Sequence, residues 1–272
     1  MKASRTALMV AAYRGRATRD NQLIDDPWAA ELAGEDGLAY AEQLDTIFPW
    51  MQLWIALRTH FIDRCIAQSD AQQIVNLGAG LDTRAARFPK PRRRFFEVDR
   101  PASSAIKQER IHGLATYPAD AATYVSCDFE TQDVIAQLAA SGFDASEPAF
   151  FICEGVTPYL TEEAVRDTLA RVASCHPRSI LTFDYVGRST GQNQRLKDAN
   201  RETRKLIERM GEPIRFGTDD VLPFLAEAGY RWVRTARFDE LALSWDGSYD
   251  PDRGMRFQSM CLASRESRVQ IG

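Results

Sequence analysis

The spacing of apolar residues changes near residue 70 of this chain. Before that point, apolar residues recur at intervals of three and four, which is the spacing of an amphipathic helix. One such stripe is formed by Leu53, Trp54, Leu57, Phe61 and Ile62. The segment Asp25-Asp26-Pro27-Trp28 is typical of a turn that leads into a helix, because proline suits the first helical position. Residues 1–70 are therefore predicted to be helical.

Short apolar runs alternate with helical patterns from residue 72 onward. The runs span residues 74–77, 95–98, 124–127, 150–153 and 180–183. Thr161, followed by Glu162 and Glu163, is placed to cap a helix between the last two runs. Near-continuous apolar strands that alternate with helices are typical of a parallel sheet covered on both faces. Residues 71–272 are thus predicted to form one doubly wound α/β domain.

The last third of the chain departs from this alternation. A polar helix is predicted over residues 194–210, and a second helix over 219–228, capped by Thr218 and stopped by Gly229. Two strands follow, at residues 232–235 and about 256–263, with no helix predicted between them. Two consecutive strands of this kind predict an antiparallel ending to the sheet.

Composition and chain length set the class of protein. The chain has 272 residues, of which 44% are hydrophobic, so it can bury a core without disulfides or structural metal. The five cysteines stand singly, which predicts reduced thiols and a cytoplasmic protein. The three histidines, His60, His112 and His176, lie too far apart in sequence to suggest a metal site, and none is expected.

Charge and hydropathy bear on possible partners. The formal net charge is −4, and we interpret the run Arg92-Arg93-Arg94 as a solvated loop rather than a phosphate-binding patch. Nucleic acid is therefore not an expected partner. No window approaches the roughly 18 consecutive apolar residues of a spanning helix, so no membrane partner is expected.

Candidate binding residues follow successive predicted strands. Gly78-Ala79-Gly80 comes directly after the first run, and Asp99 ends the second, 21 residues after Gly78. That spacing suits an acid that accepts hydrogen bonds from a ribose diol. Asp128 and Glu154 follow the third and fourth runs. Because parallel strands present their carboxyl ends at one edge, these residues predict a nucleotide site there.

The residues after Gly80 narrow the choice of nucleotide. A dinucleotide fingerprint requires a third glycine at position 83, where this chain has Thr83 preceded by Asp82. No phosphate-loop motif is present either. These features favour S-adenosylmethionine, with its cationic methionyl end. A nicotinamide-dependent oxidoreductase and a non-catalytic binding protein remain as alternatives.

Three stretches resemble a known family. They are Gln73 to Arg84 (QIVNLGAGLDTR), Phe96 to Asp99 (FEVD) and Phe151 to Leu160 (FICEGVTPYL). Together with Ser4 to Ala11, Asp25 to Trp28 and Leu57 to Thr59, they are similar to the leucine carboxyl methyltransferase family, which includes tetracenomycin polyketide O-methyltransferase-like enzymes. The resemblance covers most of the chain. It implies a doubly wound, Rossmann-like class I methyltransferase sheet of seven strands, the last antiparallel, with residues 1–70 as an N-terminal helical lid.

The resemblance also implies roles for particular residues. The cofactor-binding positions it implies are Arg58, Gly78, Ala79, Gly80, Asp99, Asp128, Phe129 and Glu154. Asp99 would hold the ribose hydroxyls, while Asp128 and the backbone of Phe129 would contact the adenine. Glu154 would lie near the ammonium. Arg58 would pair with the cofactor carboxylate, because a planar guanidinium binds a carboxylate in a bidentate manner.

The acceptor is less well specified by the sequence. A carboxylate acceptor is already ionised at pH 7 and needs no general base, whereas a hydroxyl acceptor usually does. Because the chain has few histidines, a carboxylate or acidic hydroxyl is expected. Glu130 stands where the protein-modifying members carry an arginine, which favours a small molecule over a protein C-terminus.

Three residues are candidates for the acceptor side. Tyr159 matches a tyrosine of the family and is expected either to face the acceptor or to pack under the following helix. Tyr185 and Arg188, after the fifth run, are expected to line the acceptor pocket. The sequence thus predicts an S-adenosylmethionine-dependent O-methyltransferase that releases S-adenosylhomocysteine, with secondary metabolism as one setting. A protein C-terminal carboxyl methyltransferase is the nearest alternative.

Overall fold

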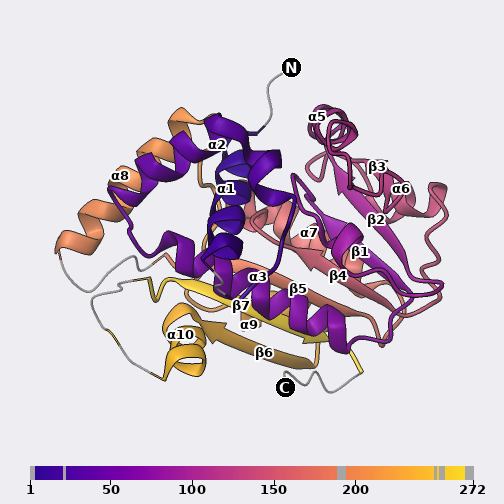
Figure 1. Ribbon diagram of the computed structural model, residues 1–272. Coiled ribbons are helices and arrows are strands. Elements are labelled where there is room, and N and C mark those ends of the chain that lie inside the picture. The colour runs from indigo at the N-terminus through magenta and orange to yellow at the C-terminus, as the bar shows by residue number, and fades with distance from the viewer. Residues whose placement is uncertain (1–3, 21–22, 189–193, 248–249, 251–254, 267–272) are drawn as a thin grey trace.

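A computed structural model describes residues 4–20, 23–188, 194–247, 250 and 255–266 (Figure 1). Its helices are α1 (Arg5–Arg19), α2 (Ala29–Asp45), α3 (Met51–Gln68), α4 (Arg84–Arg87), α5 (Pro101–His112), α6 (Val134–Ala140), the 3-10 helix η1 (Thr157–Tyr159), α7 (Glu162–Ala173), α8 (Gln194–Arg209), α9 (Leu222–Glu227) and α10 (Phe238–Asp246). Its strands are β1 (Gln73–Leu77), β2 (Arg94–Asp99), β3 (Thr123–Ser126), β4 (Ala149–Cys153), β5 (Ile180–Val186), β6 (Trp232–Arg237) and β7 (Gln258–Ser264).

The strands form one seven-stranded sheet in the order β3-β2-β1-β4-β5-β7-β6. Strands β1 to β5 pair in parallel, and β7 pairs antiparallel with both β5 and β6. The direction of the sheet order reverses between β1 and β4, which is where ligands of open α/β sheets bind. The predicted fold class, with its antiparallel last strand, is confirmed.

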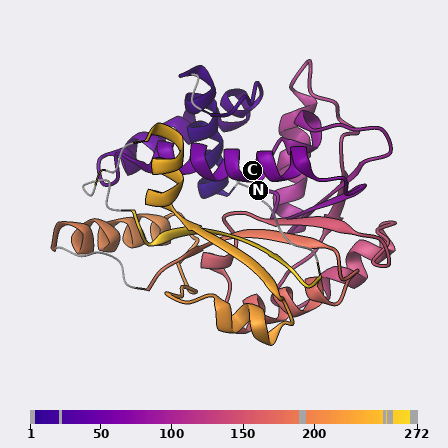
Figure 2. The same cartoon turned by 90° about the horizontal axis from the view of Figure 1, so that it is seen from below.

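Alternate side chains of each buried strand enter two separate cores. Ile74 of β1 and Ile152 of β4 pack with α1, α2 and α3, whereas Val75 and Phe151 pack with α6, α7 and α9. Figure 2 shows the sheet between these two helical layers. This burial on both faces explains why the strands appear in the sequence as nearly continuous apolar runs. Within the described residues, no helix combines the length and apolarity that a bilayer crossing requires.

Two predictions about the last third of the chain are wrong. Thr218 does not cap a helix over 219–228. Helix α9 begins at Leu222, because Pro223 occupies its first turn, and the Thr218 hydroxyl bonds within a turn to Asp220. A further helix, α10, lies between the two late strands. It was missed although its first turn is stabilised by the Glu240 side chain, which accepts from the Arg237 N–H at 2.7 Å.

Helices α1 and α2 approach so closely that glycine is required between them. A Cβ on Gly37 would lie 2.6 Å from the Leu8 carbonyl oxygen, and one on Gly15 would lie 2.8 Å from the Cα of Ala30. Both neighbours are backbone atoms, which cannot turn away as a side chain would. This contact fixes how α1 and α2 lie against each other.

We predict that Gly37→Ala destabilises the fold by about 1–3 kcal/mol, because the added methyl group forces the two helices apart. Urea unfolding followed by circular dichroism measures the change. Ala39→Ser is the matched control, since it adds one atom at an exposed position of the same helix, and its effect is expected to stay within about 0.5 kcal/mol. Equal unfolding midpoints for Gly37→Ala and the unmodified chain would contradict the prediction.

Candidate functional site

The turn after β1 is shaped by two glycines with positive φ. Gly78 has φ +73° and Gly80 has φ +47°, a region that residues with a side chain rarely adopt. The Gly78 N–H donates to the Val98 carbonyl at 2.7 Å, which ties the turn to the end of β2. A Cβ on Gly78 would lie 2.2 Å from a methyl carbon of Val156, so any other residue there would displace the Val156 side chain.

Asp99 ends β2 and faces this turn. Its Oδ2 accepts from the Gly80 N–H at 2.8 Å, and its Oδ1 accepts from the Arg100 N–H at 2.7 Å. These two backbone donors hold the half-buried carboxylate in one orientation beside the glycines.

A cavity of about 390 Å³ lies over this edge of the sheet, in the size range of small-molecule sites. Of the predicted site residues, it brings together Arg58, Gly78, Ala79, Gly80, Asp99, Phe129, Glu154 and Tyr159. Helix α1 and the residue before it add Ser4, Thr6, Ala7, Val10 and Arg14, and the segment after α8 adds Gly211, Glu212, Pro213 and Arg215. The site is therefore built from both the N-terminal helices and the sheet.

Three predicted residues do not line this cavity: Asp128, Tyr185 and Arg188. The Asp128 carboxylate instead accepts from the Glu130 N–H at 3.0 Å. Tyr185 is buried in the core on the opposite face of the sheet, and Arg188 donates from Nε to the Gly217 carbonyl at 2.6 Å. The expectation that Tyr185 and Arg188 line an acceptor pocket is thus not met by their placement.

The strand residue that does point toward the site is Asp184, one position before Tyr185. Successive side chains of a strand face opposite sides of the sheet. A shift of one residue therefore separates a side chain in the core from one that faces the site. Asp184 Oδ2 accepts from Nη1 of Arg58 at 2.8 Å, and its Oδ1 accepts from the Gly155 N–H at 2.6 Å. Asp184 was not among the predicted site residues.

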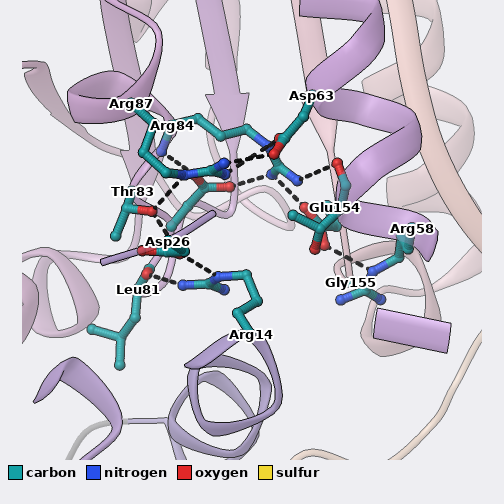
Figure 3. A network of polar contacts seen from close by, with 12 residues as sticks. Arg14, Asp26, Arg58, Asp63, Leu81, Thr83, Arg84, Arg87, Glu154 and Gly155 are labelled. Atoms are coloured by element: carbon teal, nitrogen blue, oxygen red, sulfur yellow. Dashed lines mark hydrogen bonds and ion pairs between the residues drawn. The ribbon is translucent and has the colours of Figure 1, made fainter. Parts of the chain in front are cut away.

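Arg58 of α3 lies beside Glu154 (Figure 3) and also bonds to Asp184. Besides Asp184, its Nε donates to Oε1 of Glu154 at 2.8 Å. Within the described part of the chain, no other residue accepts from its Nη2, and the side chain lines the cavity. The two residues predicted to hold the opposite charges of a cofactor are therefore paired with each other.

Arg84 joins the turn after β1 to α3 and β4. Its Nε donates to Oδ1 of Asp63 at 2.6 Å, and its Nη1 is within close ion-pair distance of Asp82 and Glu154. Arg84 is almost completely buried, with 1% of its surface exposed. A buried guanidinium of this kind must be matched by carboxylates, since an unpaired charge in the interior is very costly.

The ion pairs of Arg58 and Arg84 belong to a network of charged residues that also reaches α1 (Figure 3). Arg14 donates from Nε to Asp26 at 2.9 Å and from Nη2 to the Leu81 carbonyl at 2.6 Å. The Thr83 hydroxyl donates to the same Asp26 oxygen at 2.7 Å. Thr83 thus has a structural role, because its hydroxyl binds Asp26. A dinucleotide fold would need a glycine at this position.

The network is dense in charge and carries one excess negative charge. Its carboxylates are Asp26, Asp63, Asp82, Glu154 and Asp184, and its guanidiniums are Arg14, Arg58, Arg84 and Arg87. Sequence reasoning found Glu154 from its place after the fourth apolar run, whereas it found Arg58 only through the family resemblance. Charged residues on the apolar stripe of α3, such as Asp63, signal a buried ion pair but do not reveal its partner.

The guanidiniums lower the pKa values of three of these acids. Burial raises the pKa of Asp26, but Arg14 and Arg87 outweigh burial, and the pKa lies below its usual value. Burial also raises the pKa values of Asp82 and Glu154, but nearby cations, above all Arg84, lower them further. The pKa of each acid therefore lies below its usual value. All three are therefore carboxylates at neutral pH.

Tyr159 and Glu212 form the end of the cavity next to η1. Glu212 Oε1 accepts from the Ser4 hydroxyl at 2.7 Å, and the Thr6 hydroxyl donates to Oε2. Burial raises the pKa of Tyr159, as does the nearby Glu212 carboxylate, so the phenol stays protonated at neutral pH. Tyr159 does line the cavity, as one of its two predicted roles requires. Glu212 was not predicted, because nothing in its local sequence separates it from other surface acids.

We predict that Arg84→Met lowers the free energy of unfolding by about 3–5 kcal/mol, because it leaves buried carboxylates without their cation. Arg201→Met is the matched control. Arg201 pairs with Asp198 but keeps 61% of its side chain exposed, so its loss is expected to cost less than about 1 kcal/mol. Urea unfolding at pH 7 measures both, and equal losses would refute the buried role of Arg84.

We also predict that stability falls steeply as pH decreases below about 4.5. The pKa values of Asp26, Asp82 and Glu154 are lowered in the folded state, so the unfolded chain binds more protons in this range. Their contribution is complete above the unfolded values near 4 and is lost as pH falls through the folded ones. Thermal unfolding between pH 6 and 3 measures it, and the dependence should be weaker in Asp26→Asn. A midpoint that does not change below pH 4.5 would argue against it.

Comparisons with known proteins identify the family of this chain. Residues 7–173 match the model of the family described as leucine carboxyl methyltransferase. A protein of Mycobacterium sp. (strain JLS), named "Putative S-adenosyl-L-methionine-dependent methyltransferase", is 32% identical over 267 residues, covering 87% of this chain and 86% of that protein. A protein of the same name from Mycolicibacterium gilvum (strain PYR-GCK) is 35% identical over 203 residues, covering 66% of this chain and 65% of that protein's length.

The fold is shared with a solved structure. A DUF574 family protein from Streptomyces avermitilis superposes with a TM-score of 0.69 at 14% identity, covering 97% of this chain and 98% of the other. At that identity the likeness concerns the fold alone. The extent of the family match and the identity to the mycobacterial relative show that this chain belongs to the leucine carboxyl methyltransferase family.

Proposed function

We propose that this chain transfers a methyl group from S-adenosyl-L-methionine to a carboxylate or acidic hydroxyl oxygen of a small molecule. It is an S-adenosyl-L-methionine-dependent methyltransferase of the leucine carboxyl methyltransferase family. The observation that carries the proposal is the cavity at the carboxyl ends of β1, β2 and β4. There the glycine turn, Asp99 and the Arg58–Glu154 pair converge.

The residues around this cavity fit the cofactor. The turn at Gly78 to Gly80 lines the cavity, and Asp99 beside it offers carboxylate oxygens to the hydroxyls of a ribose. Phe129, which follows β3, adds an aromatic side chain to the cavity lining. The excess negative charge of the network suits a ligand with a cationic end, and Glu154 belongs to both the network and the cavity lining.

The order of the strands indicates how a bound cofactor would be oriented along the sheet edge. Phe129, Asp99, the glycine turn and Glu154 follow β3, β2, β1 and β4, which are neighbours in that order. The adenine would then lie toward β3, the ribose beside Asp99, and the methionyl moiety between the glycine turn and Glu154. Arg58, with Nη2 still available, would bind the cofactor carboxylate.

The bound cofactor supplies a methyl group already activated for transfer to an oxygen nucleophile. The tasks left to the protein are to orient the acceptor, exclude water and hold the surrounding charges. Helix α1 contributes Ala7 and Val10 to the cavity wall, which limits the access of water from that side. The network holds α1, α3 and the glycine turn in one arrangement, and thus keeps this wall in place.

A small molecule is favoured over a protein C-terminus as the acceptor. The family resemblance implies an arginine in the protein-modifying members where this chain has Glu130, and Glu130 pairs with Arg215 at 2.6 Å. Arg215 lines the cavity, so this pair neutralises a cation that would otherwise be free to bind a terminal carboxylate. Turnover of radiolabelled S-adenosyl-L-methionine against a panel of small acids and phenols tests the acceptor class. Labelling of peptide C-termini alone would contradict it.

We predict that Asp99→Ala weakens the binding of S-adenosylhomocysteine by about 1–3 kcal/mol, or roughly 5- to 150-fold, because buried ligand hydroxyls lose their acceptor. Isothermal titration calorimetry measures the affinity. Asp36→Ala, an exposed acid of α2 outside the cavity, should leave it unchanged. An unaltered affinity would exclude the ribose role of Asp99. The absence of binding of both S-adenosyl-L-methionine and S-adenosylhomocysteine by the unmodified chain would overturn the proposed function.

A further inference from the structure

The end of the cavity next to η1 is formed by segments far apart in sequence. Ser4 and Thr6 come from the start of α1, Tyr159 from η1, and Glu212 from the segment after α8. Since η1 follows β4, this end lies across the sheet edge from Asp99, which ends β2 on the other side of β1. An acceptor reaching the methionyl end of the cofactor would therefore meet Glu212 and Tyr159.

Glu212 is held by hydroxyl groups rather than by a cation. The Ser4 hydroxyl donates to Oε1 at 2.7 Å and the Thr6 hydroxyl donates to Oε2. Among the described residues, no lysine, arginine or histidine forms an ion pair with this carboxylate. Because an ionised carboxylate offers roughly four acceptor positions, both oxygens retain capacity for a further donor.

The arginines of the cavity wall do not provide a free cation at this end. Arg14 is paired with Asp26, Arg58 with Glu154 and Asp184, and Arg215 with Glu130. Arg100 also lines the cavity, but it follows Asp99 at the end of β2. A carboxylate acceptor beside Glu212 would thus face a like charge, whereas a hydroxyl acceptor would donate a hydrogen bond to it.

Other residues of the usual basic types are poorly placed to accept a proton here. His60 bonds through Nδ1 to the Leu23 carbonyl, His112 through Nδ1 to the Gln108 carbonyl, and the Nδ1 of His176 accepts from the Arg178 N–H. None of the three histidines lines the cavity. The Tyr159 phenol is protonated at neutral pH, so it serves as a hydrogen-bond donor and not as a base.

We propose that Glu212 is the general base of the reaction and that the acceptor class is an alcohol or phenol, not a carboxylate. This proposal rests on the proposed function and narrows it. The acceptor hydroxyl gives its proton to Glu212 while its oxygen forms a bond to the methyl carbon. The carbon–sulfur bond breaks and leaves its electron pair on sulfur. The products are a methyl ether, S-adenosylhomocysteine and a protonated Glu212, which returns its proton to solvent.

The test compares two probes that differ only in the acceptor group. These are p-cresol, a phenol with a pKa of about 10, and p-toluate, an ionised carboxylate at pH 7. With S-adenosylhomocysteine saturating, calorimetry should show the unmodified chain binding p-cresol at least about tenfold more tightly than p-toluate. In Glu212→Gln the order should reverse, because the amide N–H₂ donates to a carboxylate.

Controls separate this proposal from the proposed function. Glu163→Gln, an exposed acid of α7 outside the cavity, should keep the preference of the unmodified chain. S-adenosylhomocysteine should bind to Glu212→Gln as it does to the unmodified chain, which shows that the variant is folded. Failure of the unmodified chain to bind S-adenosylhomocysteine counts against the proposed function, whatever the probes do.

The probe results decide the proposal even if the Glu212→Gln variant does not fold, because the preference of the unmodified chain is measured independently. Tighter binding of p-toluate, equal binding or no binding of p-cresol to the unmodified chain would overturn it. Conversion of p-cresol to 4-methylanisole should also fall about 10²- to 10⁴-fold in Glu212→Gln. Rates that are equal, or undetectable in both proteins, would refute the role of Glu212 as base.

Discussion

A buried guanidinium between three structural elements holds this molecule together at its site. Arg84 follows the glycine turn and donates to Asp63 of α3 and to Glu154 beyond β4. A charge taken out of water is tolerated only with close partners of opposite sign. The turn, the helix and the strand end must therefore lie where their charged groups meet. Part of the cavity wall belongs to the same three elements, through Arg58, the glycine turn and Glu154.

The same network explains how the N-terminal helices become part of a binding site. Arg14 of α1 bonds to Asp26 and to the backbone of the glycine loop, and Arg58 of α3 bonds to the ends of β4 and β5. Ligand groups are therefore met by a surface that is already arranged, which reduces the ordering required on binding. The hydroxyls that hold Glu212 also come from the start of α1. Helix α1 and the residue before it thus contribute to the wall of the cavity both at Arg14 and at Ser4 and Thr6.

Local patterns predicted the parts of the fold that depend on local physics. The first four parallel strands were found within one residue of their bounds, and the fifth was found at its first residue but ends three residues later than predicted. The helix capped by Thr161 and the glycine turn were also found. Local patterns gave the wrong residue where the side of the sheet depended on a shift of one position, and the wrong helix start where a proline determined it. Tyr185 was chosen in place of Asp184, and the helix expected from residue 219 begins at Leu222, after the turn that Thr218 closes.

By itself, the sequence determined the layered α/β fold, the sheet edge that carries the candidate site and the candidate carboxylate at Asp99. These follow from hydrophobic periodicity and from the backbone freedom of glycine, which act over a few residues. Only the tertiary structure decided which charges meet. Arg58 and Asp184 are separated by 126 residues, and Thr6 and Glu212 by 206. Ion pairs and hydrogen bonds depend on distance in space, and the sequence alone contains no measure of that distance.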